Sequence, residues 1–406
     1  MERVFIVAAK RTPIGKFNGA LASLSAADLG TQAIQAVLKQ TELEAQNIDE
    51  VIAGHVLSAG TGMGATRQAA LKAGLAQSTP AYGVNMICGS GMKAIMEAAS
   101  HIRSNDAHLI IAAGMESMSN APFISSAQIR RGTKLGHQAL EDSILKDGLT
   151  DAFHHYPMGI TAENIANALQ ITRQQQDEFA LHSQRKAQLA IENGRFEAEI
   201  CPVEIKIRGE LQRVTRDEYP KFDCQLATLE KLKPAFDPQG SVTAGNASGI
   251  NDGASALILA SEKAVKAHHL TPLAEILSYG QAGVAPEVMG LGPVPAIANA
   301  LQKAGITLKD IQAIELNEAF AAQAIGVMKQ LSEEHQIELN ELFTRTNING
   351  GAIALGHPIG ASGNRIVTSL VYQLLSHQLD YGLASVCIGG GMGTAIVIKR
   401  CQGEIR

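Results

Sequence analysis

Three short glycine-flanked segments carry the side chains best suited to chemistry. Cys387-Ile-Gly-Gly-Gly-Met-Gly393 follows the apolar run Leu383–Val386, and Cys88-Gly-Ser-Gly91 follows Val84–Ile87. A histidine stands between glycines in Gly356-His-Pro-Ile-Gly360. Glycine at the end of a strand lets a ligand approach the backbone N–H groups closely. Two thiols and one imidazole on such turns predict acyl transfer on sulfur.

The two thiols suit different tasks. A cysteine with the ordinary pKa of about 8.5 is only slightly ionised at neutral pH. Cys88 directly precedes a predicted helix, whose N-terminus would favour the thiolate, and His357 would take its proton. Cys387 fits the removal of a proton from the carbon beside a thioester carbonyl. The resulting enolate needs preorganised donors, which the glycine turns supply as backbone N–H groups, and Asn317 is expected to orient a water or donate to the same oxygen.

The remaining cysteines and the glycine run have plainer explanations. A buried cysteine usually serves as a small hydrophobic residue, and we expect this of Cys201, Cys224 and Cys401. Gly389–Gly393 alone would suit a phosphate loop, but no Lys-Ser/Thr follows it as a P-loop requires. The combination of both thiols with the His357 turn is what favours catalysis.

Composition narrows the class of protein. The chain has 406 residues, 46% of them hydrophobic and 18% charged, which is typical of a soluble globular protein of two or three domains. A net charge of −5 without a basic stripe argues against a nucleic-acid partner. No segment approaches the roughly 20 apolar residues of a membrane span. Five scattered cysteines without a CxxC pair argue against a disulfide framework or a zinc site and favour a reducing, cytoplasmic location.

Strand-like and helix-like patterns alternate in both halves of the chain, which predicts an α/β fold. The first half predicts strands at 4–8, 50–53, 84–88 and 109–113, and helices at 29–40, 65–73 and 91–104. The second half predicts strands at 274–279, 311–316, 383–386 and 395–399, and helices at 295–304, 319–331 and 365–375. In each half a helix leads through a short polar link into a strand ending in Gly or Cys-Ile-Gly, so two similarly folded halves are expected.

Residues 115–250 lose this alternation, which indicates an inserted, lid-like subdomain. Within it, Ser126–Leu145 mixes basic, polar and small residues, as a surface or interface excursion would. Thr172-Arg-Gln-Gln175 predicts a capping box at the start of a helix that stops at Gly194.

The chemistry-bearing segments resemble the signatures of the thiolase family. Four of them occur in the family's order: Asn85-Met-Ile-Cys88-Gly-Ser-Gly-Met-Lys93, Asn317-Glu-Ala-Phe320, Gly350–Gly363 and Cys387–Gly393. Val7–Gly15 and Gly114-Met-Glu-Ser-Met-Ser119 also resemble the family, so the resemblance spans nearly the whole chain.

The resemblance implies a thiolase-like α/β fold of five layers, αβαβα, with two similar halves, mixed sheets and an inserted loop domain. Residues 1–118 would form the N-terminal half, completed by about 250–270, residues 119–249 the loop domain, and residues 271–406 the C-terminal half. It also implies a homotetramer built as a dimer of dimers. The substrates would be acetyl-CoA and 3-ketoacyl-CoA, with no metal and no other cofactor.

The resemblance also implies roles for single residues. Cys88 resembles the nucleophile that holds the acyl group, and Cys387 the acid/base at the α-carbon. His357 would activate Cys88 and form one oxyanion hole with a water held by Asn317, and the backbone N–H groups of Cys88 and Gly389 would form the other. It also implies contacts with the substrate. Ser248 would contact the pantetheine arm, and Lys221 and Thr228 would lie near the nucleotide. The other expected substrate contacts are Met158, Ala244 and Phe320.

One departure bears on the substrate. Biosynthetic members usually carry His-Met-Gly where this chain has Pro157-Met158-Gly159, and Pro-Met-Gly is more typical of degradative 3-ketoacyl-CoA thiolases. The loop Lys146–Ala152 instead resembles the biosynthetic members. We therefore predict an acyl-CoA:acetyl-CoA C-acyltransferase that works in two steps through an acyl-Cys88 intermediate, with a degradative thiolase of broad chain length as the alternative.

Two further alternatives are less favoured by the residues. A ketosynthase-like condensing enzyme shares the fold and one acylated cysteine but would lack a catalytic thiol at position 387. A non-catalytic acyl-CoA or lipid binder of this fold would tend to lose a reactive residue, whereas Cys88, Asn317, His357 and Cys387 are all present.

Overall fold

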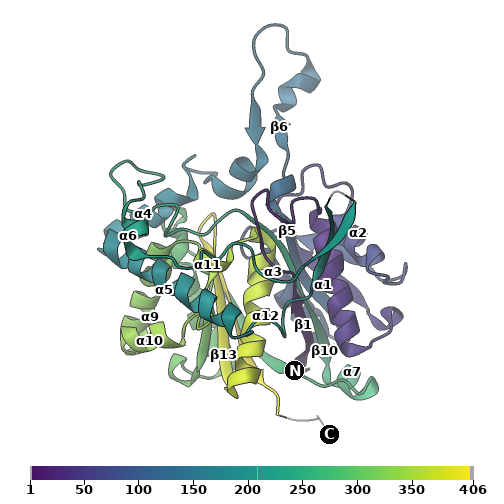
Figure 1. Cartoon of the computed structure of the whole chain (residues 1–406). Coiled ribbons are helices and arrows are strands. Elements are labelled where there is room, and N and C mark those ends of the chain that lie inside the picture. Colours follow the sequence, from purple (N-terminus) through teal and green to yellow (C-terminus); the bar gives the residue numbers. More distant parts are fainter. Residues whose placement is uncertain (1, 208, 403–406) are drawn as a thin grey trace.

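The structure, a computed structural model that describes residues 2–207 and 209–402, is built on one long mixed sheet (Figure 1). Its strands follow the spatial order β12-β13-β14-β11-β1-β10-β5-β3-β4, and β2 pairs with β10. The strands are β1 (Val4–Arg11), β2 (Gly15–Lys16), β3 (Glu50–Gly54), β4 (Ala81–Val84), β5 (Leu109–Ser117), β10 (Asn251–Ser261), β11 (Ala274–Gly283), β12 (Ala313–Leu316), β13 (Tyr381–Ile388) and β14 (Met392–Arg400).

The sheet consists of two halves with the same pairing pattern. In β1-β10-β5-β3 the neighbours are antiparallel, antiparallel and parallel, and β11-β14-β13-β12 repeats that order. Within the sheet, the two halves are joined by the β1–β11 ladder, which consists of the residue pairs Phe5↔Glu275 and Ile6↔Ala274. This arrangement confirms the prediction of two similar halves with mixed sheets.

Helices lie in three layers around the two half-sheets. The outer helix α1 (Ala26–Thr41) packs on β1, β5 and β10, and the outer helix α8 (Pro293–Ala304) packs on β11, β13 and β14. Between the half-sheets run α3 (Ser90–Arg103) and α12 (Ile359–His377), which contact each other and strands of both halves. Five layers, αβαβα, are therefore present as predicted.

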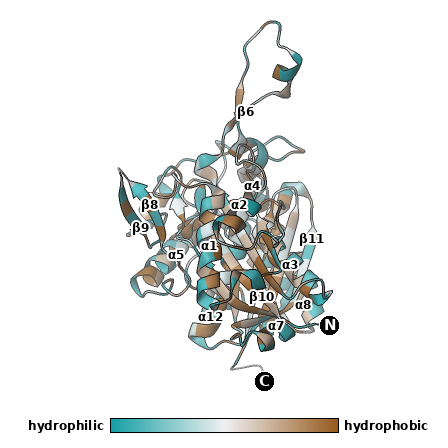
Figure 2. Ribbon diagram, turned by 90° about the vertical axis from the view of Figure 1, so that its right-hand side faces the viewer, coloured by the Kyte–Doolittle hydropathy of each residue, from teal (hydrophilic) through white to brown (hydrophobic). Residues whose placement is uncertain are grey.

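A separate hydrophobic core fills each interface between layers. One core lies under α1, a second surrounds α3 and α12, and a third lies under α8 and α9 (Ala321–His335). Strands that are buried on both faces have apolar residues in succession, as the run Ala256–Ala260 of β10 does, and this strand is coloured brown in Figure 2. Burial of this apolar surface is the main force that holds the layers together.

Two glycines allow the central helices to touch backbone to backbone. A Cβ atom at Gly91 would lie 2.8 Å from the backbone nitrogen of Asn364, and one at Gly363 would lie 2.6 Å from the backbone nitrogen of Met92. Any side chain at either position would force α3 and α12 apart. The N-termini of both helices, with Cys88 and His357 just before them, are thereby held close together.

The inserted segment contributes helices and two small hairpins. Its helices are α4 (Met158–Ala168), α5 (Arg173–Glu192) and α6 (Leu226–Glu230), and its strands pair as β6 (Phe123–Ser125) with β7 (Leu140–Asp142) and β8 (Val203–Ile207) with β9 (Glu210–Val214). The predicted capping box of Thr172 and Gln175 is present at the start of α5. The β6–β7 hairpin projects from the body of the molecule as an arm (Figure 1).

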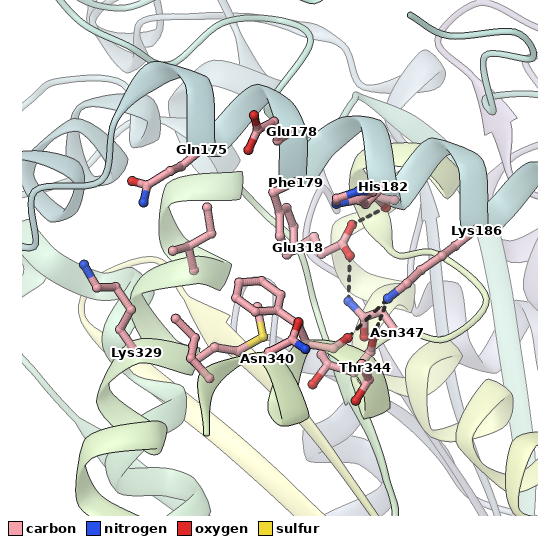
Figure 3. Close-up of a pocket in the computed structure, with 16 residues that line it drawn as sticks. Gln175, Glu178, Phe179, His182, Lys186, Glu318, Lys329, Asn340, Thr344 and Asn347 are labelled. Carbon is pink, nitrogen blue, oxygen red and sulfur yellow. Dashed lines mark hydrogen bonds between the residues drawn. The ribbon is translucent and has the colours of Figure 1, made fainter. Parts of the chain in front are cut away.

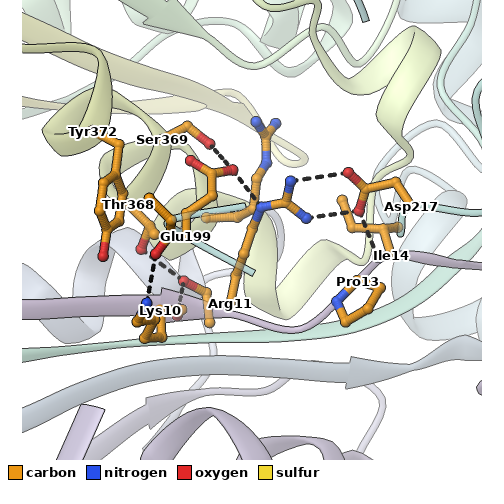
Figure 4. Close-up of polar contacts among 12 residues, drawn as sticks. Lys10, Arg11, Pro13, Ile14, Glu199, Asp217, Thr368, Ser369 and Tyr372 are labelled. Carbon is orange, nitrogen blue, oxygen red and sulfur yellow. Dashed lines mark hydrogen bonds and ion pairs between the residues drawn. The ribbon is translucent and has the colours of Figure 1, made fainter. Parts of the chain in front are cut away.

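A buried ion cluster ties this segment to the sheet (Figure 4). The fully buried guanidinium of Arg11 on β1 contacts Glu199 at 2.6 Å and Asp217 at 2.7 and 2.9 Å. Asp217 also accepts from the backbone N–H of Ile14, and Glu199 accepts from the Ser369 hydroxyl on α12. Paired, hydrogen-bonded charges of this kind are tolerated inside a protein, whereas single ones are costly.

Two element predictions were wrong in their bounds. The strand expected at 84–88 ends at Val84, because residues 85–89 form a tight turn with hydrogen bonds from Gly89 to Met86 and from Ser90 to Ile87. The helix expected at 365–375 spans Ile359–His377, because its glycine-containing first turn is stabilised by packing. Within residues 2–207 and 209–402, no helix is long and apolar enough to cross a membrane.

Candidate active site

Cys88 lies on a strained turn between β4 and α3. The preceding residue, Ile87, has a φ of 46°, a left-handed conformation that is unfavourable for a β-branched side chain. Ser90 holds the turn, because its hydroxyl donates to the Ile87 carbonyl at 2.6 Å and accepts from the Met86 N–H at 2.8 Å. The turn places the sulfur just before the N-terminus of α3 while the chain reverses direction.

The environment of Cys88 disfavours its thiolate. Burial raises the pKa of Cys88 to about 11, although backbone hydrogen bonds from Gly389 and from Cys88 itself act in the lowering direction. The helix N-terminus was expected to stabilise the thiolate, but desolvation outweighs it at this site. Gly389 belongs to the Cys387 turn, so the C-terminal half contributes to the environment of this sulfur.

Cys387 is the second-last residue of β13 and is fully buried. It packs in an apolar cluster that includes Met158, Met289 and Phe320. Burial raises the pKa of Cys387 far above its usual range, and the charge of a Cys88 thiolate would raise it further. A Cβ atom at Gly89 would lie 2.3 Å from Cδ1 of Ile388, so the two cysteine turns face each other at close range.

His357 precedes α12 and is neutral. Burial and the charge of Arg365 lower the pKa of His357 to about 3. Its Nδ1 lies 2.6 Å from Oγ of Ser362, whose hydroxyl donates to the Pro358 carbonyl at 3.0 Å. Because the Ser362 proton is used there, the network assigns the His357 proton to Nδ1 and leaves the Nε2 lone pair free. The ring is thus set to accept a proton at Nε2.

Asn251 fixes the backbone beside this histidine. Its Oδ1 accepts from the His357 N–H at 2.9 Å, and its Nδ2 donates to the Gly15 carbonyl at 3.0 Å. A Cβ atom at Gly356 would lie 2.5 Å from Cγ of Asn251. The amide therefore fits only against glycine, and it holds the His357 turn to β2 and β10.

Asn317 brings an amide to the same histidine. It follows β12, is fully buried, and its Nδ2 lies 3.5 Å from Nε2 of His357. Its Oδ1 has no protein hydrogen-bond partner, which is unusual for a buried polar atom. That free acceptor is suited to a water or a substrate group.

Glu318, the residue after Asn317, holds this loop to α5 and to the segment around Asn347 (Figure 3). Its carboxylate accepts from Ser183 on α5, from Asn347, and from the backbone N–H of Ile353. A cavity of about 400 Å³ opens on the far side of Glu318, between α5, α9 and α10 (Leu339–Arg345). None of the cysteines lines this cavity, so it is separate from the thiol site.

The predicted substrate contacts divide into two groups. Met158 and Phe320 pack beside Cys387, and the backbone N–H of Ser248 donates to the Ala319 carbonyl at 2.9 Å, so these three border the site. Ala244, Lys221 and Thr228 are exposed on the inserted segment. Their placement suits contact with a more distant part of a long ligand.

Sequence reasoning missed four residues of this site. Asn251, Ser362 and Met289 contact or surround the predicted residues, and Glu116 binds the backbone beside them. Ser362 and Glu116 lie inside segments that matched the thiolase pattern, which was the only available signal. Asn251 and Met289 are far from those segments in the chain, and only the fold brings them to the site.

Comparison with known proteins agrees with this fold. The family descriptions "Thiolase, N-terminal domain" and "Thiolase, C-terminal domain" match residues 4–263 and 270–400. An acetyl-CoA acetyltransferase of Escherichia coli K12 is 52% identical over 98% of this chain and 100% of its own length. A cytosolic acetyl-CoA acetyltransferase of Rattus norvegicus is 47% identical over 98% of both chains.

Solved structures show the same likeness. An acetyl-CoA acetyltransferase of Syntrophomonas wolfei superposes with a TM-score of 0.96 at 40% identity, covering 99% of this chain and 100% of that one. Human mitochondrial 3-ketoacyl-CoA thiolase in complex with CoA superposes with a TM-score of 0.93 at 42% identity, covering 99% and 98% of the two chains. The chain belongs to the thiolase family.

Proposed function

We propose that this protein is an acetyl-CoA C-acetyltransferase, an enzyme that catalyses reversible Claisen condensation and thiolysis of CoA thioesters. One observation carries the proposal: the Cys88 turn of the first half and the Cys387 turn of the second half face each other, since a Cβ atom at Gly89 would lie 2.3 Å from Cδ1 of Ile388. A single acylated thiol needs no such partner. Relatives at about 50% identity over the full chain carry this activity in their names.

In the first step, Cys88 takes the acyl group. The sulfur attacks the thioester carbonyl while its proton passes to Nε2 of His357, and the CoA thiolate leaves and accepts that proton. A neutral thiol and a neutral imidazole are the resting pair, because the pKa of Cys88 is raised to about 11 and that of His357 lowered to about 3. Charge therefore develops during the reaction, and the backbone N–H groups of Cys88 and Gly389 would stabilise the oxyanion.

In the second step, the thiolate of Cys387 removes a proton from the α-carbon of a second acetyl-CoA. The enolate attacks the acyl-Cys88 carbonyl, a carbon–carbon bond forms, and the carbon–sulfur bond to Cys88 breaks. The Cys88 thiolate that leaves takes up the proton held by Cys387, which restores both groups. A water on the free Oδ1 of Asn317 would donate its other proton to the enolate oxygen, and His357 would donate there in the tautomer that carries its proton on Nε2. A Cys88 thiolate would raise the pKa of Cys387, and an acylated Cys88 cannot carry that charge. These steps require no metal or redox cofactor.

The acyl chain that the enzyme accepts is the point on which two functions differ. Pro157 caps α4 without a side-chain hydrogen bond and supplies no imidazole to the bound thioester, which favours a degradative thiolase. The acetyltransferase relatives favour the four-carbon product. Thiolysis of 3-ketoacyl-CoA substrates from acetoacetyl-CoA to long chains separates them: activity confined to acetoacetyl-CoA supports the acetyltransferase, and a broad profile supports the alternative.

Replacement of Cys387 tests the division of labour. In Cys387→Ala, exchange of label between acetyl-CoA and free CoA, which needs only Cys88, is expected to persist. Condensation should fall by about 10²–10⁴-fold, the usual contribution of a general acid/base. Cys401→Ala, at a cysteine outside the site, is the matched control and should retain both rates. Loss of exchange together with condensation in a folded Cys387→Ala protein would contradict the proposed mechanism.

We also propose that the enzyme is a cytoplasmic homotetramer. The arm formed by β6 and β7 exposes large apolar residues, Phe123 at 64%, Leu135 at 96% and Leu140 at 65% of their surface. Apolar side chains on a protruding hairpin are suited to contact with further copies of the chain. The cytosolic location stated in the names of the rat and mouse relatives supports the location.

A further inference from the structure

The two halves place chemically different residues at equivalent positions around the site. The parallel ladders end with Gly54↔Gly114 in the first half and Leu316↔Ser385 in the second. His55 therefore corresponds to Asn317, and Glu116 corresponds to Cys387. Cys88 and His357 also correspond, because each directly precedes the N-cap of a central helix. Four of these six residues already have a role in the proposed reaction, and His55 and Glu116 have none.

Glu116 is fully buried and binds backbone from two separate loops. Its Oε2 accepts from the Val56 N–H at 3.1 Å and from the Gly360 N–H at 2.9 Å, and its Oε1 accepts from the Leu57 N–H at 3.1 Å. A Cβ atom at Gly360 would lie 2.6 Å from Oε2, so only glycine admits this contact. The carboxylate thus holds the loop after β3 against the first turn of α12.

Those two loops adjoin the two turns that carry the reacting groups. The loop after β3 contacts the Cys88 turn, because the His55 N–H donates to the Val84 carbonyl at 3.1 Å and Asn85 donates to the Val56 carbonyl at 3.4 Å. Gly360 lies three residues after His357. Val56, Leu57 and Ile359 pack in one apolar cluster with Cys88. A carboxylate that holds both loops therefore fixes one turn relative to the other.

We propose that Glu116 is a positioning residue that sets the Cys88 turn against the His357 turn. Its own charge would act on the nucleophile as well, since a negative charge at this place opposes formation of the Cys88 thiolate. Glu116 would thereby keep Cys88 as a thiol until His357 can take the proton. The activity readout of this inference rests on the proposed function, whereas its labelling readout does not.

The groups around Glu116 are consistent with this role. Burial raises the pKa of Glu116 to about 7, with Asp252 on β10 acting in the same direction and the three backbone hydrogen bonds opposing it. His55, whose Nε2 lies 3.5 Å from Oε1, is neutral because burial lowers its pKa to about 4. The charge of Glu116 contributes to the raised pKa of Cys88.

The experiment compares Glu116→Gln with Asp49→Asn. Asp49 also accepts two backbone N–H groups, from His108 and Leu109, but it is exposed and lies at the opposite end of β5, so it controls for loss of a carboxylate-to-backbone contact alone. In Glu116→Gln, kcat should fall by about 10–100-fold, as expected for misplaced reacting groups, with KM for acetyl-CoA changed less than about two-fold. The rate at which iodoacetamide alkylates Cys88 should at the same time rise at neutral pH, while Cys201 and Cys387 stay unlabelled.

The outcomes separate the two proposals. If wild-type protein has no thiolysis activity, the proposed function fails, and the alkylation rates of Cys88 still test Glu116. If folded Glu116→Gln matches Asp49→Asn in kcat and in the pH dependence of alkylation, the positioning role is wrong. Should Glu116→Gln fail to fold, wild-type hydrogen exchange decides: protection of the Val56, Leu57 and Gly360 amides should drop as the pH falls through about 7, and unchanged protection would overturn the inference.

Discussion

Cys88 is partly buried and His357 is buried, and each is held in its neutral form. The pKa of the thiol is raised to about 11, and the pKa of the imidazole is lowered to about 3. A pair of this kind cannot rest as thiolate and imidazolium, in contrast to cysteine sites where an ion pair forms before substrate binds. The proton of Cys88 must therefore move to His357 while the sulfur attacks the thioester. This transfer requires a lone pair on Nε2 that points toward the thiol.

The first prediction concerns Ser362, which fixes that lone pair. In Ser362→Ala the Nδ1 proton of His357 loses its acceptor at 2.6 Å, so both tautomers become populated. We expect kcat/KM for thiolysis to fall by about 10-fold or more, with a shifted pH profile and little change in thermal stability. Ser376→Ala removes a hydroxyl that bonds the Gln373 carbonyl at the far end of the same helix and serves as the control. Equal profiles for the two variants would refute the tautomer assignment.

Among the elements, the N-termini of α3 and α12 do most to place the site. Each helix begins directly after a reacting residue, and the glycine contacts between the helices leave no room for them to slide apart. The inserted segment closes the site from outside, since Met158 of α4 packs against Cys387. What ties that segment to the sheet is the ion cluster of Arg11.

The second prediction tests that cluster. Arg11→Met leaves the carboxylates of Glu199 and Asp217 buried without their cation, and we expect a loss of about 3–5 kcal/mol of unfolding free energy. A triple variant that also replaces Glu199 and Asp217 with apolar residues of similar size should recover most of that loss, because no unpaired charge remains. Urea denaturation of the three proteins measures both. A triple variant as unstable as Arg11→Met would show that packing, not charge, dominates.

For the whole molecule, buried ionisable groups give stability a definite pH dependence. Burial raises the pKa of Glu116 and of Glu315 to about 7, so the native state holds protons that the unfolded chain releases. The contribution of these two carboxyls to the free energy of unfolding is fully present below about pH 4.5 and is lost as the pH rises through about 7. His55 and His357 act oppositely: their lowered pKa values cost stability as the pH falls through about 6.5.

The third prediction follows from those signs. Unfolding free energy should rise by about 1–2 kcal/mol between about pH 8 and pH 6.5, and then level off as the histidines oppose the carboxyls. Urea denaturation across this range measures it. Glu315→Gln should remove about half of the rise, since one of the two carboxyls is gone. A stability that falls over this interval would contradict the assigned shifts.

The fourth prediction concerns assembly. Charged replacements at the arm, Leu135→Glu together with Leu140→Glu, should lower the mass in solution below that of a tetramer, because the apolar contacts between copies are lost. Light scattering after size-exclusion chromatography measures the mass. Leu211→Glu, at an equally exposed leucine on β9, is the control and should leave the mass unchanged. An arm variant that keeps the wild-type mass would show that the arm does not join the copies.

Much of the site could be read from residue types and spacing alone. The turns that carry Cys88, His357 and Cys387 are visible because glycine clusters after apolar runs are local features of the chain. The capping box of α5 was predictable for the same reason, since hydrogen bonds within a few residues determine it. The strand before Asn317 was predictable from its apolar residues, although its ladder partner lies on β13. The repeated order of strands and helices likewise predicted two similar halves.

The sequence by itself determined which groups are present, where the chain turns, and which faces are apolar. Only the tertiary structure decided that Cys88 is held as a thiol rather than stabilised by its helix, since desolvation by distant segments outweighs the local effect. It also decided that Glu116 holds two loops, one 60 and the other 244 residues away in the chain. Contacts over such separations leave no periodic trace in a sequence, because they depend on how whole layers pack.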